Sequence, residues 1–126
     1  MTPRVVRLYI QVANIERAAA FYESLLGLHG ERISPGRHDF HLEPFTLCCF
    51  DPGAEGEPTG ASPLPDYLCI AVADLDTAYA RARGAGCQWL DEIDTHTTGE
   101  RAFTLRDPFG NPIQLIDAST LPAPKA

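Results

Sequence analysis

The stretch VANIERAAAF, residues 12–21, is matched sixty positions later by VADLDTAYAR, residues 72–81. In both copies an alternating segment ends at a valine, an Asn or Asp follows two residues later, and apolar residues then recur at helical spacing. Asn and Asp are favoured residues at the N-cap of a helix. The repeat therefore predicts two copies of a strand–helix unit, whose sheets curl toward each other and enclose a cavity.

The composition indicates a single globular domain spanning residues 1–126. Hydrophobic residues make up 44% and charged residues 21% of the chain, which is ordinary for a globular protein. The net charge of −7 argues against nucleic-acid or membrane partners. Without an apolar run long enough to span a bilayer or a signal-peptide pattern after Met1, we expect a cytoplasmic location. The four cysteines have no CxxC spacing, so reduced thiols are expected.

The pattern around the repeat predicts a strand–helix–three-strand module at about residues 4–51. Residues 4–12 alternate as a strand, Asn14 caps the helix, and Gly27 fits the left-handed position that ends it. Three short strands are expected near residues 30–34, 40–43 and 45–51.

A segment rich in Pro and Gly at residues 52–65 reads as a linker, after which the pattern restarts. Asp74 caps the second helix, and strands are expected near residues 87–92, 101–106 and 112–117. The second module covers about residues 66–117, and residues 118–126 form a loose tail. The predicted fold is α+β, with two tandem βαβββ modules forming a curled mixed sheet around the cavity.

Several motifs resemble those of the vicinal-oxygen-chelate superfamily, which includes glyoxalase I, extradiol dioxygenases, and fosfomycin- and bleomycin-resistance proteins. The resemblance spans about residues 5–117 and includes Phe21-Tyr22, Leu26-Gly27 and, most specifically, the turn DPFGNP at residues 107–112. In this turn Pro108 presets φ and Gly110 permits a positive φ. Asp107 and Asn111 supply side chains that bond to nearby backbone.

Enzymes of this superfamily hold a divalent metal with His, Glu or Gln from the first and last strand of each module. The resemblance places these positions on Arg7, Cys48, Tyr67 and Gln114. A guanidinium repels a cation, Gln offers a neutral oxygen, and a lone thiol or phenol is a poor partner for hard ions. We therefore expect no metal and no other cofactor. Because His38 and His41 are three residues apart, they would lie on opposite faces of a strand.

Without a metal, the cavity wall offers groups suited to recognising a small molecule. Arg7 could bind a carboxylate or phosphate, unless it pairs with an internal acid, and for Trp89 packing in the core is the alternative. The predicted ligand-binding residues are Arg7, Tyr9, Gln11, Cys48, Tyr67, Trp89, Phe103 and Gln114.

Three functions remain open. The first is a metal-free protein of the bleomycin-resistance type that binds a polar or charged organic ligand between the modules. The second is a glyoxalase- or dioxygenase-like lyase or oxidoreductase with a shifted or degenerate metal site, or a metal-independent enzyme using Tyr67 or His41 as acid or base. The third is a partner-binding module. The acidic composition favours a cationic ligand and Arg7 an anionic one, so the ligand charge stays open. Exposed sheet edges predict a homodimer.

Overall fold

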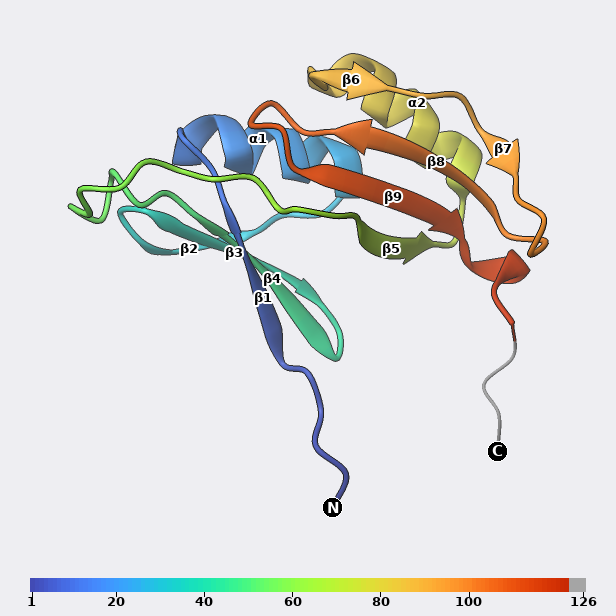
Figure 1. Cartoon of the computed structure of the whole chain (residues 1–126), viewed down its shortest axis with the longest axis horizontal. Coiled ribbons are helices and arrows are strands. Elements are labelled where there is room, and N and C mark those ends of the chain that lie inside the picture. The colour runs from blue at the N-terminus through green and yellow to red at the C-terminus, as the bar shows by residue number, and fades with distance from the viewer. Residues whose placement is uncertain (123–126) are drawn as a thin grey trace. The chain divides into compact units, whose positions relative to one another are not determined.

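The computed structural model describes residues 1–122, and the chain divides into two compact units, Met1–Leu64 and Pro65–Ala126 (Figure 1). Each unit contains one α-helix and one sheet with both parallel and antiparallel strand pairs. The predicted α+β class and the repeated strand–helix unit are therefore confirmed. Neither described helix is long and apolar enough to cross a membrane.

The first unit builds a four-stranded sheet with the order β1-β4-β3-β2. The helix α1 lies between the first and second strands in sequence, and β1 runs parallel to β4. The elements are β1 (Arg7–Gln11), α1 (Ile15–Leu26), β2 (Glu31–Ser34), β3 (Arg37–Leu42) and β4 (Phe45–Phe50).

Alternation along the strands gives the first sheet one apolar face, which α1 covers. Ile10, Leu47 and Phe40 are fully buried there, and the ring of Tyr22 from α1 lies 6.1 Å from that of Phe40. Burying each such side chain contributes about 1.5–3 kcal/mol. The other face of this sheet, opposite α1, is therefore the one on which polar residues can gather.

The second unit repeats this plan with the strand order β5-β9-β8-β6, and β7 also pairs with β8. In Figure 1 its helix α2 runs alongside β8 and β9. The elements are β5 (Leu68–Val72), α2 (Leu75–Ala85), β6 (Trp89–Leu90), β7 (Asp94–Thr95), β8 (Arg101–Arg106), β9 (Pro112–Asp117) and the 3-10 helix η1 (Ala118–Thr120).

Strand register confirms the expected correspondence between the last strands of the two units. Leu8 pairs with Leu47 in the first sheet, as Leu68 pairs with Ile113 in the second. Cys48 and Gln114, one residue further along, therefore occupy equivalent positions.

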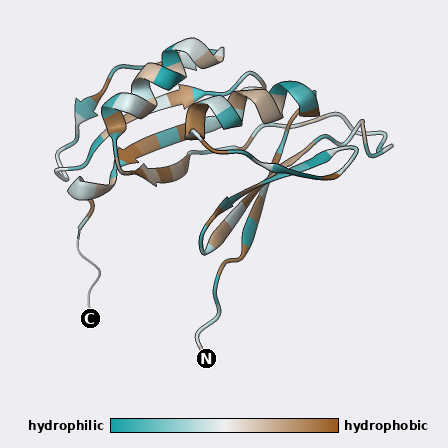
Figure 2. Cartoon of the chain, turned by 180° about the vertical axis from the view of Figure 1, so that it is seen from behind, coloured by the Kyte–Doolittle hydropathy of each residue, from teal (hydrophilic) through white to brown (hydrophobic). Residues whose placement is uncertain are grey.

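The helix ends follow the sequence prediction. The Asn14 and Asp74 side chains accept hydrogen bonds from the backbone N–H groups of Arg17 and Thr77, at 3.1 Å and 3.0 Å. Gly27 ends α1 in the left-handed region with φ 68°. Each helix also shows both hydrophilic and hydrophobic residues along its length in Figure 2, as expected of a helix with one buried side.

The DPFGNP turn has the geometry that its residues predict. Asp107 is fully buried, and its carboxylate accepts hydrogen bonds from the backbone N–H groups of Phe109 and Asn111 at 2.9 Å and 2.8 Å. Gly110 has φ 88°. These bonds reverse the chain into β9.

Several element boundaries differ from the prediction. The third strand starts at Arg37 rather than Phe40, because the two residues Pro35-Gly36 already close the turn from β2. The strand expected over 87–92 shrinks to β6, and β7 was not predicted. The expected loose tail begins with η1, in which Thr120 accepts a hydrogen bond from the backbone N–H of Arg101 at 3.0 Å. Its last four residues, 123–126, lie outside the described part of the chain.

The predicted linker is attached to the first unit. Glu55 accepts a hydrogen bond from the backbone N–H of Gly36 at 3.0 Å and also bonds the hydroxyl of Ser34. Further on, the backbone N–H of Ser62 donates to Gln11 at 2.8 Å. The segment therefore packs on its own unit instead of running free.

Candidate functional site

Three neighbouring strands carry polar residues on the face of the first sheet opposite α1. The strand register arranges these residues in rows across β1, β4 and β3. The rows are Arg7, Thr46 and His41; Tyr9, Cys48 and Asp39; and Gln11, Phe50 and Arg37. Adjacent strands lie about 4.8 Å apart, so each row spans about 10 Å.

At the centre of this face a buried carboxylate is paired with an arginine. Asp39 is 3% exposed, and Arg37 donates two hydrogen bonds to it, from Nε at 2.9 Å and from Nη2 at 2.8 Å. Burial raises the pKa of Asp39, but the hydrogen bonds from Arg37 and Cys48 outweigh it and the pKa is lowered overall. The pair therefore stays ionised, and its two charges cancel.

Aromatic rings pack beside this ion pair. The guanidinium carbon of Arg37 lies 5.4 Å from the centroid of the Tyr9 ring, which meets Phe50 edge-to-face with centroids 6.0 Å apart. A cation over an aromatic face and an edge-to-face ring pair are both favourable arrangements. Tyr9 is nevertheless 44% exposed, so part of its ring remains available to a ligand.

The thiol of Cys48 is fully buried beneath these side chains. Burial, followed by a hydrogen bond to Asp39 and the charge of that carboxylate, raises the pKa of Cys48 to about 11. A thiol with this pKa is protonated at neutral pH, so it is not a nucleophile there.

The other two predicted ligand-binding residues of the first unit, Gln11 and Arg7, differ in their contacts. Gln11 accepts the hydrogen bond from Ser62 at 2.8 Å and so anchors the linker. Arg7 is exposed and has no ion pair with any residue in the described part of the chain, but its charge acts on the Cys48 thiol. The internal arginine–acid pair that the sequence suggested for Arg7 is found at Arg37 instead.

In the second unit the predicted ligand-binding residues do not all lie on the same face of the sheet. Gln114 lies opposite Cys69, whose thiol donates to the Gln114 side-chain oxygen at 3.4 Å, and Tyr67 is 48% exposed just before β5. Trp89 is 47% exposed at the start of β6, so it does not pack in the core.

Phe103 departs from the expectation of a ligand-facing residue. It is 2% exposed, and its ring lies 5.1 Å from that of Tyr79 in α2. The alternation of β8 turns Phe103 toward the helix, so it belongs to the core of the second unit.

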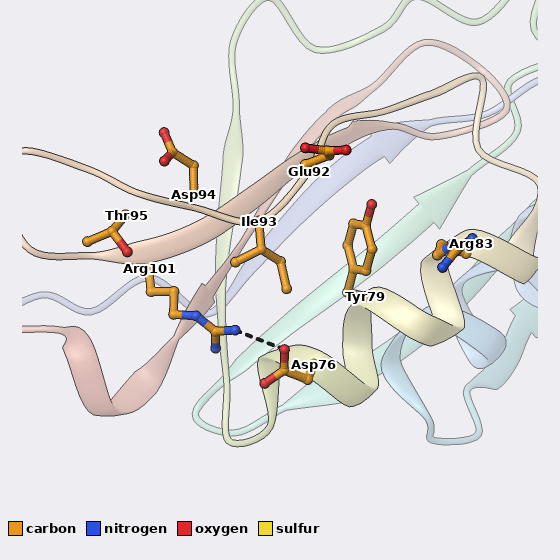
Figure 3. A pocket seen from close by; sticks show the side chains of 8 residues that line it. All are labelled: Asp76, Tyr79, Arg83, Glu92, Ile93, Asp94, Thr95 and Arg101. Atoms are coloured by element: carbon orange, nitrogen blue, oxygen red, sulfur yellow. Dashed lines mark hydrogen bonds and ion pairs between the residues drawn. The ribbon is translucent and has the colours of Figure 1, made fainter.

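A pocket of about 720 Å³ is lined by α2, by residues 92–95, which include β7, and by Arg101 of β8 (Figure 3). Arg101 reaches from β8 to Asp76 at 2.8 Å, and Tyr79 and Arg83 project from α2. Carboxylates and arginines mix in the lining, and none of the lining residues is buried. None of the predicted ligand-binding residues lines this pocket.

The sequence analysis named His41 as a candidate acid or base, but it did not place His41 together with Arg37 and Asp39 on the face opposite α1. Their signal was the spacing of two residues, which places all three on one side of a strand. It was overlooked because a polar run after Pro35-Gly36 resembles a continued loop. As predicted, His38 and His41 lie on opposite faces, since His38 pairs with Cys49 and His41 with Thr46.

The residues at the four metal positions of the family do not fit a divalent cation. Arg7 brings a positive charge, Cys48 is a single thiol, which prefers soft metals, and Gln114 offers an amide oxygen already bonded to Cys69. At the fourth metal position, Tyr67 offers only a phenol, which is a poor partner for hard ions. Within residues 1–122, no three His, Cys, Asp or Glu side chains are grouped as a metal site.

Comparison with solved structures finds the same fold in proteins of low sequence identity. A glyoxalase/bleomycin resistance protein from Albidiferax ferrireducens has a TM-score of 0.74 at 21% identity, covering 88% of this chain and 96% of its own. A lactoylglutathione lyase from Agrobacterium tumefaciens has a TM-score of 0.71 at 18% identity, with coverages of 91% and 93%. A glyoxalase-related enzyme from Fulvimarina pelagi has a TM-score of 0.76 at 19% identity, with coverages of 91% and 88%.

The family model of the Glyoxalase/Bleomycin resistance protein/Dioxygenase superfamily matches residues 4–115, nearly the whole chain. The chain therefore belongs to this superfamily, as the repeat and the DPFGNP turn indicated. A comparison with curated proteins found no match.

Proposed function

We propose that this protein binds a polar or charged small organic ligand without a metal ion, on the face of the first sheet opposite α1. The observation that carries the proposal is the chemistry of Arg7 and Cys48. A fixed positive charge stands at one family metal position, and a protonated thiol bonded to Asp39 stands at another. The positive charge of Arg7 opposes cation binding, whereas the same face offers hydrogen-bond donors and an exposed aromatic ring for a ligand.

Metal analysis of untagged protein, purified without chelator and then exposed to Ni²⁺, Zn²⁺, Mn²⁺ or Fe²⁺, tests the first half of the proposal. We expect less than about one-tenth of a metal ion per chain after desalting, given the tight binding that transition metals show at intact sites. Stoichiometric metal that is lost in Tyr67→Phe or Gln114→Ala would contradict the proposal.

A thermal-shift screen of small organic molecules tests the second half. A ligand that binds only the folded state raises the melting temperature in proportion to RT ln(1 + [L]/Kd). The proposal expects hits whose shift falls in Tyr9→Ala, because Tyr9 supplies the exposed ring. A control is Leu121→Ala, which truncates another exposed apolar side chain, in the second unit and outside the predicted ligand-binding residues.

One observation favours a second candidate, metal-independent acid–base catalysis. His41 is exposed on the same face, its Nδ1 lies 3.3 Å from the hydroxyl of Thr46, and Arg7 completes the row. Histidine is the most frequent general acid or base in enzymes. Incubating each screening hit with stoichiometric protein and following its NMR spectrum separates the two functions. Conversion that His41→Gln abolishes without weakening binding would establish catalysis.

We also propose that the chain forms a homodimer, because each sheet has edge strands whose backbone groups lack a partner within that sheet. Light scattering after gel filtration should give twice the chain mass of 13.7 kDa. A mass of one chain across the accessible concentration range would contradict this expectation.

A further inference from the structure

Within the strands β1, β4 and β3, the face of the first sheet opposite α1 carries one more arginine than carboxylate, although the whole chain has a charge of −7. Arg37 and Asp39 cancel each other through two hydrogen bonds. No other carboxylate lies in the three rows across β1, β4 and β3, and Arg7 has no ion pair in residues 1–122. The unpaired charge of these three strands is therefore the Arg7 guanidinium, whereas the carboxylate of Glu31 lies on this face at the edge strand β2, opposite Asp39.

The row that contains this guanidinium consists of groups that bind oxygen anions. The register places Thr46 beside Arg7 on one side and beside His41 on the other. The imidazole Nδ1 and the Thr46 hydroxyl lie 3.3 Å apart, so these two side chains already point toward each other. A guanidinium offers two parallel N–H donors that match a carboxylate or phosphate, and the hydroxyl and imidazole add donors along the same row.

The next row supplies an apolar surface beside these donors. The Tyr9 ring is held from two sides, by the guanidinium of Arg37 at 5.4 Å and by the edge of Phe50 at 6.0 Å between centroids. A ring fixed in this way loses little further entropy when a ligand stacks on it. Since Tyr9 is two residues from Arg7 on one strand, the two side chains share a face about 6.6 Å apart.

We propose that the ligand of this face is an oxyanion, a carboxylate or a phosphate, attached to a flat apolar group. Arg7 receives the anionic oxygens together with Thr46 and His41, and the apolar group packs on Tyr9. This inference rests on the proposed small-molecule binding, and it names the ligand's chemical class. The positive charge that a metal ion would supply to substrate oxygens is supplied here by a side chain of the protein.

A panel of four single-ring probes tests the inference, because the probes share the ring and differ in the charged group. Benzoate and phenyl phosphate carry the two oxyanions, benzamide is neutral, and benzylamine is cationic. Titrations followed by amide chemical shifts should give Kd values on the order of 1 mM for the two anions, as expected for fragments of this size. Benzamide and benzylamine should bind at least about tenfold more weakly, a difference of about 1.4 kcal/mol. The shifts should centre on Arg7, Thr46 and Tyr9.

Arg7→Gln should weaken the binding of both anions at least about tenfold and leave benzamide binding unchanged, because the variant removes the charge-assisted hydrogen bonds to the anionic oxygens. Arg4→Gln is the matched control, since it removes the same charge from an exposed position before β1. Arg4→Gln should change the anion affinity less than twofold, as expected for a screened surface charge.

Equal binding of benzamide and benzoate, or an Arg7→Gln variant that binds benzoate normally, would overturn the inference and leave small-molecule binding intact. Absence of binding by all four probes would overturn it as well. Binding of only one of the two anions, sensitive to Arg7, would support it and identify that oxyanion. Failure of the proposed metal-free function would instead appear as stoichiometric metal in the metal analysis described above.

Discussion

The guanidinium of Arg37 forms two parallel hydrogen bonds with the carboxylate of Asp39, at 2.9 Å and 2.8 Å, although the two residues are only two positions apart on β3. Residues at this spacing share a face of the strand, and the buried position of Asp39 requires a partner. The pair also removes one carboxylate and one arginine from the reach of a ligand, and within residues 1–122 Arg7 is then the arginine of β1, β4 and β3 that has no ion pair.

Replacing Asp39 with Ala should destabilise the fold by about 1–3 kcal/mol, because it leaves the Arg37 guanidinium without its acceptor. The side chain of Arg37 is 24% exposed and can still reach water, which keeps the cost below that of a fully buried charge. Urea denaturation measures the change. The double variant Arg37→Met/Asp39→Leu should lose less stability than the sum of the losses in Arg37→Met and in Asp39→Leu. A loss equal to that sum would show that the two side chains are not coupled.

The stability from Asp39 should depend on pH in a defined direction. Its pKa is lower in the folded state than in the unfolded state, so its contribution is complete above the unfolded pKa of about 3.9 and is lost as the pH falls through the folded pKa. The difference in unfolding free energy between the wild type and Asp39→Asn should therefore narrow below about pH 4. The exposed Glu57→Gln serves as a control for general charge effects. A difference in unfolding free energy that stays constant until the protein unfolds in acid would contradict the lowered pKa of Asp39.

Cys48 should resist alkylation in the folded protein. Its pKa of about 11, compared with an ordinary value of 9.0, reduces the thiolate fraction at pH 8 about 100-fold, and burial blocks access further. Iodoacetamide treatment and peptide mass spectrometry should show modification of the exposed Cys69 well before Cys48. In denaturant both cysteines should react at similar rates. Comparable labelling of Cys48 in the native protein would indicate that this face opens to solvent.

Gly30→Ala should destabilise the first unit by about 1–3 kcal/mol, the usual cost of overpacking. A methyl group at this position would lie 2.6 Å from the His38 ring and 2.8 Å from the backbone oxygen of Asp39. Gly60→Ala is a matched control, because the same methyl group meets nothing within 4 Å there. Thermal denaturation of the two variants should separate them clearly, and equal melting temperatures would show that β3 shifts without cost.

Asp107→Ala should destabilise the second unit by about 1–3 kcal/mol for each buried N–H that loses its acceptor. The carboxylate of Asp107 also accepts from the side-chain amide of Asn111 at 2.9 Å, so the turn loses several bonds at once. Asp107→Asn keeps one oxygen acceptor and should cost less. Hydrogen exchange of the Phe109 and Asn111 amides provides the residue-level measurement, and unchanged protection in Asp107→Ala would contradict the role of the carboxylate.

The sequence by itself determined the repeated strand–helix unit, its caps and its reversing turn. These features depend on local chemistry, such as the Asn14 and Asp74 caps and the left-handed glycines Gly27 and Gly110, which act on residues close by in the chain. The resemblance to the superfamily, carried over residue by residue, also placed two family metal positions on Arg7 and Cys48.

Only the tertiary structure decided which of these residues are buried and which are paired. Burial and pairing depend on neighbours from other strands, so the Arg37–Asp39 ion pair, the elevated Cys48 pKa and the isolation of Arg7 could not be derived from spacing. The same reason explains why Phe103 was misplaced, since its side of β8 is set by the register with β9 and by the contact with Tyr79. Local patterns specify the elements, and contacts between strands distant in sequence determine the charge and exposure of each side chain.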